Sequence, residues 1–287
     1  MQKLVYRAFA KINLLLDVVG RRADGYHNLV MLNQSIDMCD TVTVEKVQNQ
    51  GIHVACDCKG IPLDEGNIVY RACNAFALYS DVSIVLEKRI PTGAGLAGGS
   101  ADAAAVLAAL NQLYSDPTRE SLYSIAAQVG ADVPFCLMGG SCLAEGIGEA
   151  LTPLPPLPND YLIALVKPEI SISTAEAYAA LDKIDIIHPP AAQAIALAKR
   201  GHWEAAFPLC ANVFEQVTAL PGLAEAKRRA MDSGALLTQM TGSGSAVFSI
   251  FHKDINPGGI VEALRILNKN VKIYRPVPYG VRVIENE

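Results

Sequence analysis

The sequence predicts an α+β fold divided into two domains, and three observations support this prediction. Runs that alternate between apolar and polar residues, as strands do, are interspersed with runs of helical spacing in both halves. The chain has 287 residues, of which 51% are hydrophobic, and this length usually exceeds a single core. A segment with four prolines in eight residues, 153–160, interrupts the pattern. We therefore predict domains at 1–155 and 156–287.

The predicted first domain is rich in short strands at its beginning and in helices toward its end. Alternation and aliphatic content indicate the strands, and an alanine-rich run after the glycines has the highest helix propensity. We expect strands at 4–16, 40–45, 51–55 and 82–90, an apolar run through Met31 and Ile36, and helices at 67–79, from Ala101 onward and at 118–129.

The predicted second domain alternates strands with helices. Tyr161–Val166 has the composition of a buried strand, and Ser173–Glu176 matches a capping box that opens the helix carrying Tyr178. We expect further helices at 190–199, 221–232 and 258–268, and strands near 236–240, 246–251 and 271–275.

Composition excludes several classes of protein. The formal net charge is −5 and no Lys/Arg-rich run occurs, which argues against nucleic acid or an anionic membrane as a partner. No apolar run approaches the roughly 20 residues that span a bilayer, and Lys11 and Asp17 interrupt the apolar stretch that a signal peptide would need. Seven cysteines without metal-ligand spacing indicate reduced thiols, so we expect a cytoplasmic protein.

The glycine-rich stretch Pro91–Ser100 predicts a phosphate-binding loop. Four glycines in nine residues allow sharp bends and close approach of backbone N–H groups to a ligand. The helix that follows would add its unpaired N–H donors and positive dipole end. The alternative is an ordinary turn capped by Ser100. Neither a Gly-Lys-Ser/Thr ending nor the acidic residue of a dinucleotide fold is present, so the loop is of a third kind.

Two charged residues stand out from their surroundings. Lys11 lies in the middle of an aliphatic strand, where an unpaired ammonium would be costly, so it either faces solvent or has a carboxylate or phosphate partner. Asp132 stands between Gly130 and Pro134, where an aspartate commonly caps a helix or forms a turn.

Three segments together with Asp132 resemble the GHMP kinases, a family of small-molecule kinases. Asp24–His27 is similar to the branch that acts on 4-diphosphocytidyl-2-C-methyl-D-erythritol. Ala97 and Ala101 depart from the family pattern, which commonly has glycine and serine there. The segments are Ala10–Leu14 with Gly20–Leu29, Pro91–Ala104, and Met240–Ser245, and Asp132 lies within Gly130–Phe135.

The resemblance implies a GHMP kinase fold: an N-terminal domain similar to the second domain of ribosomal protein S5 and a ferredoxin-like C-terminal domain, with the active site between them. It implies transfer of the ATP γ-phosphoryl group, with Mg²⁺, to the 2-hydroxyl of that cytidine diphosphate substrate, a step toward isoprenoid precursors. It implies a monomer or weak homodimer in the cytoplasm, without nucleic-acid or membrane partners and without a metal site made by the protein alone.

The resemblance also assigns residues. It implies that Lys11 and Asp132 are catalytic, with the carboxylate accepting the hydroxyl proton. The ATP-binding residues would be Lys88, Pro91, Thr92, Gly93, Ala94, Gly95, Leu96, Ala97, Gly98, Gly99, Ser100 and Ala101. The substrate-binding residues would be Asn13, Tyr26, His27, Thr174, Tyr178, Gly242 and Ser243.

Several alternatives stay open at this point. Ser100 either contacts phosphate or magnesium or only caps the helix, Lys88 either lies near the nucleotide or is a solvated strand end, and Tyr178 either stacks on a base or packs in the core. A GHMP kinase for homoserine, mevalonate or a sugar is the competing enzyme. A kinase-like sensor without turnover is the competing binding protein, because a fold does not imply activity. The acidic balance disfavours a nucleic-acid module.

Overall fold

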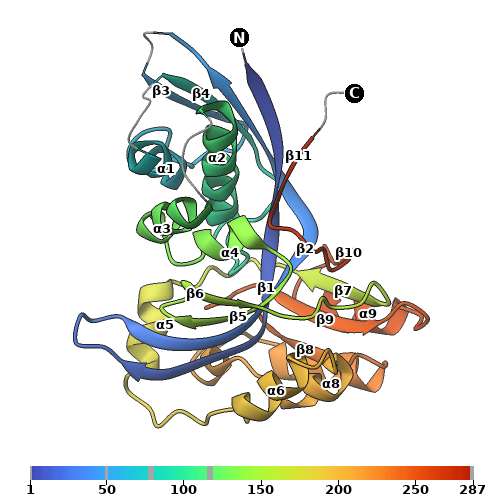
Figure 1. Ribbon diagram of the computed structural model, residues 1–287. Helices are drawn as coiled ribbons and strands as arrows, with labels where there is room; N and C mark the ends of the chain where they lie inside the picture. The colour runs from blue at the N-terminus through green and yellow to red at the C-terminus, as the bar shows by residue number, and fades with distance from the viewer. Residues whose placement is uncertain (1, 49–50, 77–80, 115–118, 285–287) are drawn as a thin grey trace.

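The computed structural model describes residues 2–48, 51–76, 81–114 and 119–284. Within these residues the strands form one seven-stranded and one four-stranded sheet, and Figure 1 shows helices packed against both. The α+β prediction is confirmed. The division at 155/156 stays a prediction, because one continuous core includes Leu14 of the first sheet and Ile163 and Phe248 of the second.

A long antiparallel hairpin forms the centre of the first sheet. Strand β1 spans Lys3–Arg21 and β2 spans His27–Lys46, so the runs expected separately up to Ile36 and at 40–45 are one strand. Register shifts after Phe9, Asn13 and Val18 interrupt the pairing, and such irregularities bend and twist a strand. The bent hairpin reaches from the helices of the first part of the chain to α5 of the second (Figure 1).

Shorter strands complete this sheet in the order β11-β1-β2-β4-β3, and β5 joins β2 and β6. The three-residue β11 comes from the C-terminal end of the chain and pairs with β1. The expected strands at 51–55 and 82–90 are confirmed within a few residues, whereas the other three strands were not predicted. The bounds are β3 Ile52–Cys56, β4 Val82–Glu87, β5 Ser141–Gly146, β6 Ala150–Pro153 and β11 Val281–Val283.

Helix α2 lies against this sheet and is enclosed by its neighbours. Its residues 101–107 are all buried, which explains why this segment is built almost entirely of small and aliphatic residues. Val133 begins a helix that was not predicted, directly after Asp132. The helices of this part are α1 Ile68–Phe76, α2 Gly98–Tyr114, α3 Arg119–Val129 and α4 Val133–Met138.

The second sheet is antiparallel with the order β10-β7-β9-β8. With α8 between β7 and β8 and α9 between β9 and β10, it has the β-α-β-β-α-β arrangement of ferredoxin-like folds. The bounds are β7 Tyr161–Val166, α5 Thr174–Leu181, α6 Ala191–Ala198, α7 Trp203–Ala206, α8 Leu223–Asp232, β8 Leu237–Met240, β9 Val247–His252, α9 Gly258–Arg265 and β10 Lys272–Tyr274, with short 3₁₀ turns at Phe207–Leu209 and Val213–Gln216.

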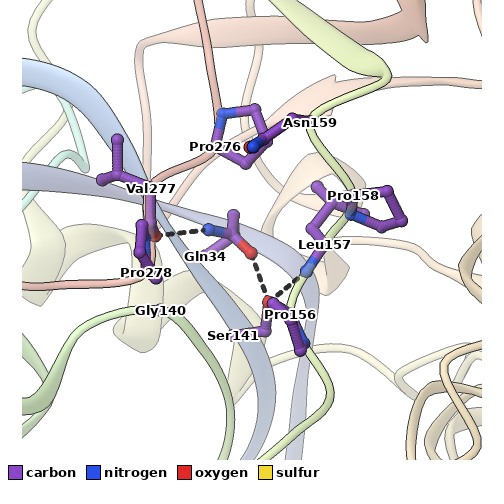
Figure 2. Close-up of a pocket in the computed structure, with 10 residues that line it drawn as sticks. All are labelled: Gln34, Gly140, Ser141, Pro156, Leu157, Pro158, Asn159, Pro276, Val277 and Pro278. Atoms are coloured by element: carbon purple, nitrogen blue, oxygen red, sulfur yellow. Dashed lines mark hydrogen bonds between the residues drawn. The ribbon is translucent and has the colours of Figure 1, made fainter.

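The proline-rich connector packs against the C-terminal segment around a cavity of about 280 Å³ (Figure 2). The Gln34 side chain donates to the Val277 carbonyl and accepts from the Ser141 hydroxyl. Ser141 in turn accepts from the Leu157 N–H at 2.9 Å. Because these polar groups form hydrogen bonds with one another, we interpret this cavity as a structural contact between the connector and the C-terminal segment. No helix in the described part of the chain is long and apolar enough to cross a bilayer.

Candidate active site

The three predicted motifs, far apart in the sequence, meet at the glycine-rich loop. The Lys11 N–H of β1 donates to the Leu96 carbonyl at 3.1 Å. From the loop 241–245, the Thr241 hydroxyl donates to the Gly95 carbonyl at 3.3 Å. Next to it, the Ala246 N–H donates to the Ala94 carbonyl at 3.2 Å. The glycine-rich loop is therefore held from both sheets.

Alternate residues of the glycine-rich loop are left-handed. Gly93, Gly95 and Ala97 have φ angles of +60°, +75° and +58°, and Ala97 is the single non-glycine residue with positive φ in the described residues. Backbone that alternates in this way turns successive N–H groups toward one side and forms an anion-binding concavity. A Cβ atom at Gly95 would lie 2.1 Å from the Thr241 carbonyl oxygen, so this position requires glycine for space as well.

Two cavities adjoin the loop, and Gly95 and Ala97 line both. The larger, which we call the acceptor cavity, has about 340 Å³ and contains Lys11 and Asp132. The other, the loop cavity, has about 300 Å³ and is lined by Ile68, Lys88 and residues 90–100. A loop shared by two cavities is a suitable place for transfer of a group from a ligand in one cavity to a ligand in the other.

Lys11 and Asp132 form the predicted pair. Lys11 Nζ lies 3.8 Å from Asp132 Oδ2, and the lysine side chain is 5% exposed while the aspartate side chain is 34% exposed. Asp132 lies in the turn before α4, at the N-cap position, as expected, but its side chain makes no capping bond. The carboxylate thus remains available at the edge of the cavity, beside the buried ammonium.

Asn13 does not face the acceptor cavity, contrary to the expectation that it binds substrate. Its side chain is completely buried, and its Oδ1 accepts from Lys11 Nζ at 2.9 Å and from the Gly242 N–H at 2.8 Å. Its Nδ2 donates to Asn33 at 2.7 Å. Because protein atoms occupy these groups, Asn13 orients Lys11 from behind the cavity.

Lys88 is not a solvated strand end, because its ammonium is already paired inside the protein. Its ammonium donates to carboxylate oxygens of Asp40 and Asp102, and all three side chains are at most 5% exposed. Asp40 also accepts from the Ile90 N–H at 2.8 Å. The Asp40–Lys88–Asp102 triad therefore joins β2, the end of β4 and α2. The expectation of a solvated strand end is wrong, whereas the place of Lys88 in the lining of the loop cavity leaves its position near the nucleotide as a prediction.

One ammonium shared by two buried carboxylates changes proton affinities. Burial and the Asp40 carboxylate raise the pKa of Asp102 to about 7, although Lys88 opposes this shift. Burial alone would lower the pKa of Lys88, but the two carboxylates outweigh it and raise it. Asp102 Oδ1 has no hydrogen-bond partner in the described residues, which adds to the cost of ionising this carboxyl group.

Ser100 is the third residue of α2, because the helix begins at Gly98. It therefore does not cap the helix, and its place beside the loop cavity leaves the phosphate or magnesium role as a proposal. A Cβ atom at Gly98 would lie 2.9 Å from Ile90 Cγ2. Glycine at 98 thus allows the loop to pack on Ile90. Ala101, predicted to bind ATP, is completely buried on the helix and offers a ligand no exposed surface.

The residues predicted to bind the base gather at the turn between β1 and β2. The His27 ring stacks on Tyr178 of α5, with centroids 4.7 Å apart and planes 21° apart. Tyr178 packs edge-on against Phe214 with centroids 4.9 Å apart, and both line the acceptor cavity. Burial raises the pKa of Tyr178 to about 12, so its hydroxyl stays protonated. Tyr26 is 61% exposed.

Hydroxyl groups from two elements complete the acceptor cavity. Thr174 Oγ1 at the start of α5 and Ser243 Oγ lie 2.8 Å apart. Both line the cavity together with Gly242, so the structure brings these three predicted substrate residues beside Lys11 and Asp132. Ser173 caps α5 as expected, since its hydroxyl accepts from the Glu176 N–H at 3.4 Å.

Sequence reasoning missed three acidic residues at this site: Asp40, Asp102 and Asp182. Asp102 carried a signal, since a lone acid within a run of alanines on a buried helix requires a partner. Asp40 begins the alternating run predicted at 40–45. Asp182 directly follows α5, and nothing in the sequence indicates that His27 lies next to it. His27 Nε2 and Asp182 Oδ1 are 2.7 Å apart.

Comparisons with known proteins agree with this geometry. The family models for the GHMP kinases N terminal domain and the GHMP kinases C terminal match residues 67–140 and 191–270. A 4-diphosphocytidyl-2-C-methyl-D-erythritol kinase of Alkaliphilus metalliredigens is 40% identical over 282 residues, which is 95% of this chain and 96% of that protein. A kinase of the same name from Alkaliphilus oremlandii is 42% identical over 260 residues, 88% of this chain and 89% of that protein.

Solved structures extend the comparison. A crystal structure of 4-(cytidine 5'-diphospho)-2C-methyl-D-erythritol kinase is 33% identical with a TM-score of 0.71, covering 95% of this chain and 99% of that one. A homoserine kinase from Cytophaga hutchinsonii has a TM-score of 0.76 at 20% identity, covering 99% and 98%, which shows a common fold. By family models, relatives and the meeting of the three motifs, this chain belongs to the GHMP kinases, and within them to the 4-diphosphocytidyl-2-C-methyl-D-erythritol kinases.

Proposed function

We propose that this protein transfers the γ-phosphoryl group of ATP to the 2-hydroxyl of 4-diphosphocytidyl-2-C-methyl-D-erythritol. The observation that carries the proposal is the glycine-rich loop between two cavities, with the Lys11–Asp132 pair in the acceptor cavity. ATP phosphates would lie against the loop backbone from Pro91 to Ser100. The cytidine substrate would extend from Asp132 toward Tyr178, with Thr174 and Ser243 beside it.

The geometry supports a direct transfer. The substrate hydroxyl oxygen forms a bond to the γ-phosphorus as the bond to the β-phosphate oxygen breaks, and its proton passes to the Asp132 carboxylate. Lys11 holds that carboxylate in place through the ion pair, and Asn13 holds Lys11. Backbone N–H groups of the loop stabilise the charge that develops on the phosphoryl oxygens. The products are ADP and a phosphate monoester.

The side chains at the loop fit a Mg²⁺ ion that arrives with ATP. Mg²⁺ is commonly held by one or two carboxylates together with substrate phosphates, and Ser100 and Asp132 supply oxygen atoms at the two cavities. The described residues contain no cluster of three His, Cys, Asp or Glu side chains that could hold a metal ion. When bound, the ion neutralises charge on the transferring group. The free thiols of all seven cysteines suit the reducing cytoplasm, where we place the reaction.

A coupled assay of ADP formation tests the proposal. We expect turnover with ATP and the cytidylated erythritol, and little with mevalonate or homoserine, because only the first offers a base to the Tyr178 end of the acceptor cavity. Faster turnover of mevalonate or homoserine than of the cytidine substrate would contradict the proposal.

A further inference from the structure

The carboxylate of Asp182 fixes the hydrogen on one ring nitrogen of His27. His27 Nε2 lies 2.7 Å from Asp182 Oδ1, and the bond to His27 lowers the pKa of Asp182. An ionised carboxylate can only accept. Nε2 must therefore carry the hydrogen, and in the neutral imidazole Nδ1 is left as an acceptor. Nδ1 has no hydrogen-bond partner among the described residues.

Asp182 is itself held in place from two sides. Its N–H donates to the Tyr178 carbonyl at 3.0 Å as α5 ends, and its second carboxylate oxygen lies 3.4 Å from Arg21 Nη1. Figure 1 shows the turn between β1 and β2 beside α5. An acidic residue at a helix C-terminus faces the negative end of the helix dipole. Helix stability therefore does not explain this aspartate, whereas its contact with His27 does.

His27 stands next to the acceptor cavity, in contact with one of the side chains that line it. His27 stacks on Tyr178, and Tyr178 lines that cavity. Cytosine carries an amino group at position 4, which donates, whereas uracil carries a carbonyl oxygen there, which accepts. An acceptor at Nδ1 pairs with the cytosine amino group and opposes the uracil oxygen. The opposite tautomer would offer a donor and reverse this preference.

We propose that Asp182 is a positioning residue that makes the site selective for cytosine over uracil by holding His27 in the tautomer with hydrogen on Nε2. The inference rests on the proposed function, since it needs a pyrimidine nucleotide as substrate. It differs from an anchoring role for Asp182, in which only the contact between the hairpin turn and α5 would matter.

Two measurements test this proposal, one by NMR on the ligand-free protein and one by enzyme assay. Nitrogen-15 NMR of the histidine side chains at about pH 8, above the ordinary imidazole pKa of about 6.5, reports the tautomer. The chain has five histidines, and His27→Gln identifies the resonance. Steady-state assays with the cytidine substrate and its uridine counterpart then give the ratio of kcat/KM for the two bases.

Asp182→Asn is the decisive variant. Its amide can still accept from Nε2 but can also donate to it, so the contact survives while the tautomer is no longer fixed. We expect mixed tautomers and a fall of roughly 10- to 100-fold in the preference for cytidine, carried mainly by KM. Asp182→Glu, which restores a carboxylate, should recover most of the preference. Asp185→Asn, the same change at a nearby exposed aspartate, should alter neither measurement.

The outcomes separate this inference from the proposed function. Hydrogen on Nδ1 in the unaltered protein, or full cytidine preference in a folded Asp182→Asn variant, overturns the inference alone. Absence of turnover with either nucleotide by the unaltered protein overturns the proposed function and this inference together.

Discussion

Lys11 and Lys88 are two nearly buried lysines beside the same loop, yet their surroundings give them different roles. Lys11 faces one carboxylate, that of Asp132, which is 34% exposed and 3.8 Å away. Lys88 is enclosed by two carboxylates with side chains 0% and 4% exposed. A single open ion pair leaves charge and a base available to a ligand, whereas a closed triad neutralises its own ammonium. The comparison teaches that a lysine beside the glycine-rich loop offers its charge to a ligand only where its own partners leave that charge open.

The largest effect, on turnover, is expected at the open ion pair of Lys11 and Asp132. Asp132→Ala should lower kcat by roughly 10²–10⁴-fold, because the hydroxyl proton loses its acceptor, while KM changes little. Lys11→Ala should be similarly damaging. The double variant should lose little more than either single one, because the two residues act as a unit. Near-normal turnover in folded Asp132→Ala, measured by ADP release, would remove this residue from the mechanism.

The next effect concerns stability at the triad. Lys88→Met leaves two buried carboxylates without a cation and should lower the free energy of unfolding by about 3–5 kcal/mol. Lys253→Met is the matched control, because Lys253 pairs with Asp160 at the surface with side chains 54% and 61% exposed, and such pairs contribute about 0–1 kcal/mol. Equal losses for the two variants in urea unfolding would show that the triad is not a buried ionic unit.

A smaller effect is expected in the pH dependence of the free energy of unfolding, to which the Asp40–Lys88–Asp102 triad contributes. The pKa of Asp102, raised to about 7, lies above its unfolded value of about 3.9, so the folded state binds more protons between these two values. Stability contributed at this site is therefore present below about pH 4 and is lost as the pH rises to about 7. Asp102→Asn should flatten the decline of unfolding free energy across this window. An unchanged pH profile would contradict the raised pKa.

The smallest effect is expected at Ala97. Its left-handed backbone costs about 1–2 kcal/mol for a residue with a Cβ atom, and glycine would relieve this while adding about 0.5–1 kcal/mol of unfolded-state entropy. Ala97→Gly should therefore stabilise the protein by up to about 1 kcal/mol. Ala94→Gly, at a buried loop position without positive φ, should destabilise it. Thermal unfolding of the two variants measures both stability changes. Destabilisation by Ala97→Gly would contradict the claim that the backbone at Ala97 is strained.

The sequence predicted the functional pair better than the structural contacts around it. An ammonium in an aliphatic strand either faces solvent or needs a carboxylate or phosphate partner, and the family resemblance then named Asp132 as the partner of Lys11. The partners of Lys88 lie 48 and 14 positions away in the chain, and only the pairing of β2 with β4 and the packing of α2 bring them together. Strand β2 was expected as two runs with a gap at 37–39, yet the strand continues there. Asp37 in this gap exchanges hydrogen bonds with the Arg275 backbone, a tertiary contact without a local signal.

The same isosteric change at the partner of each lysine tests the central claim most directly. Asp132→Asn and Asp102→Asn are measured side by side for kcat with the cytidine substrate and for free energy of unfolding. We predict that Asp132→Asn loses roughly 10²–10⁴-fold in kcat with unchanged stability, whereas Asp102→Asn keeps kcat within several-fold and changes stability and its pH dependence. A loss of turnover in folded Asp102→Asn as large as in Asp132→Asn, or full turnover in Asp132→Asn, would contradict the account.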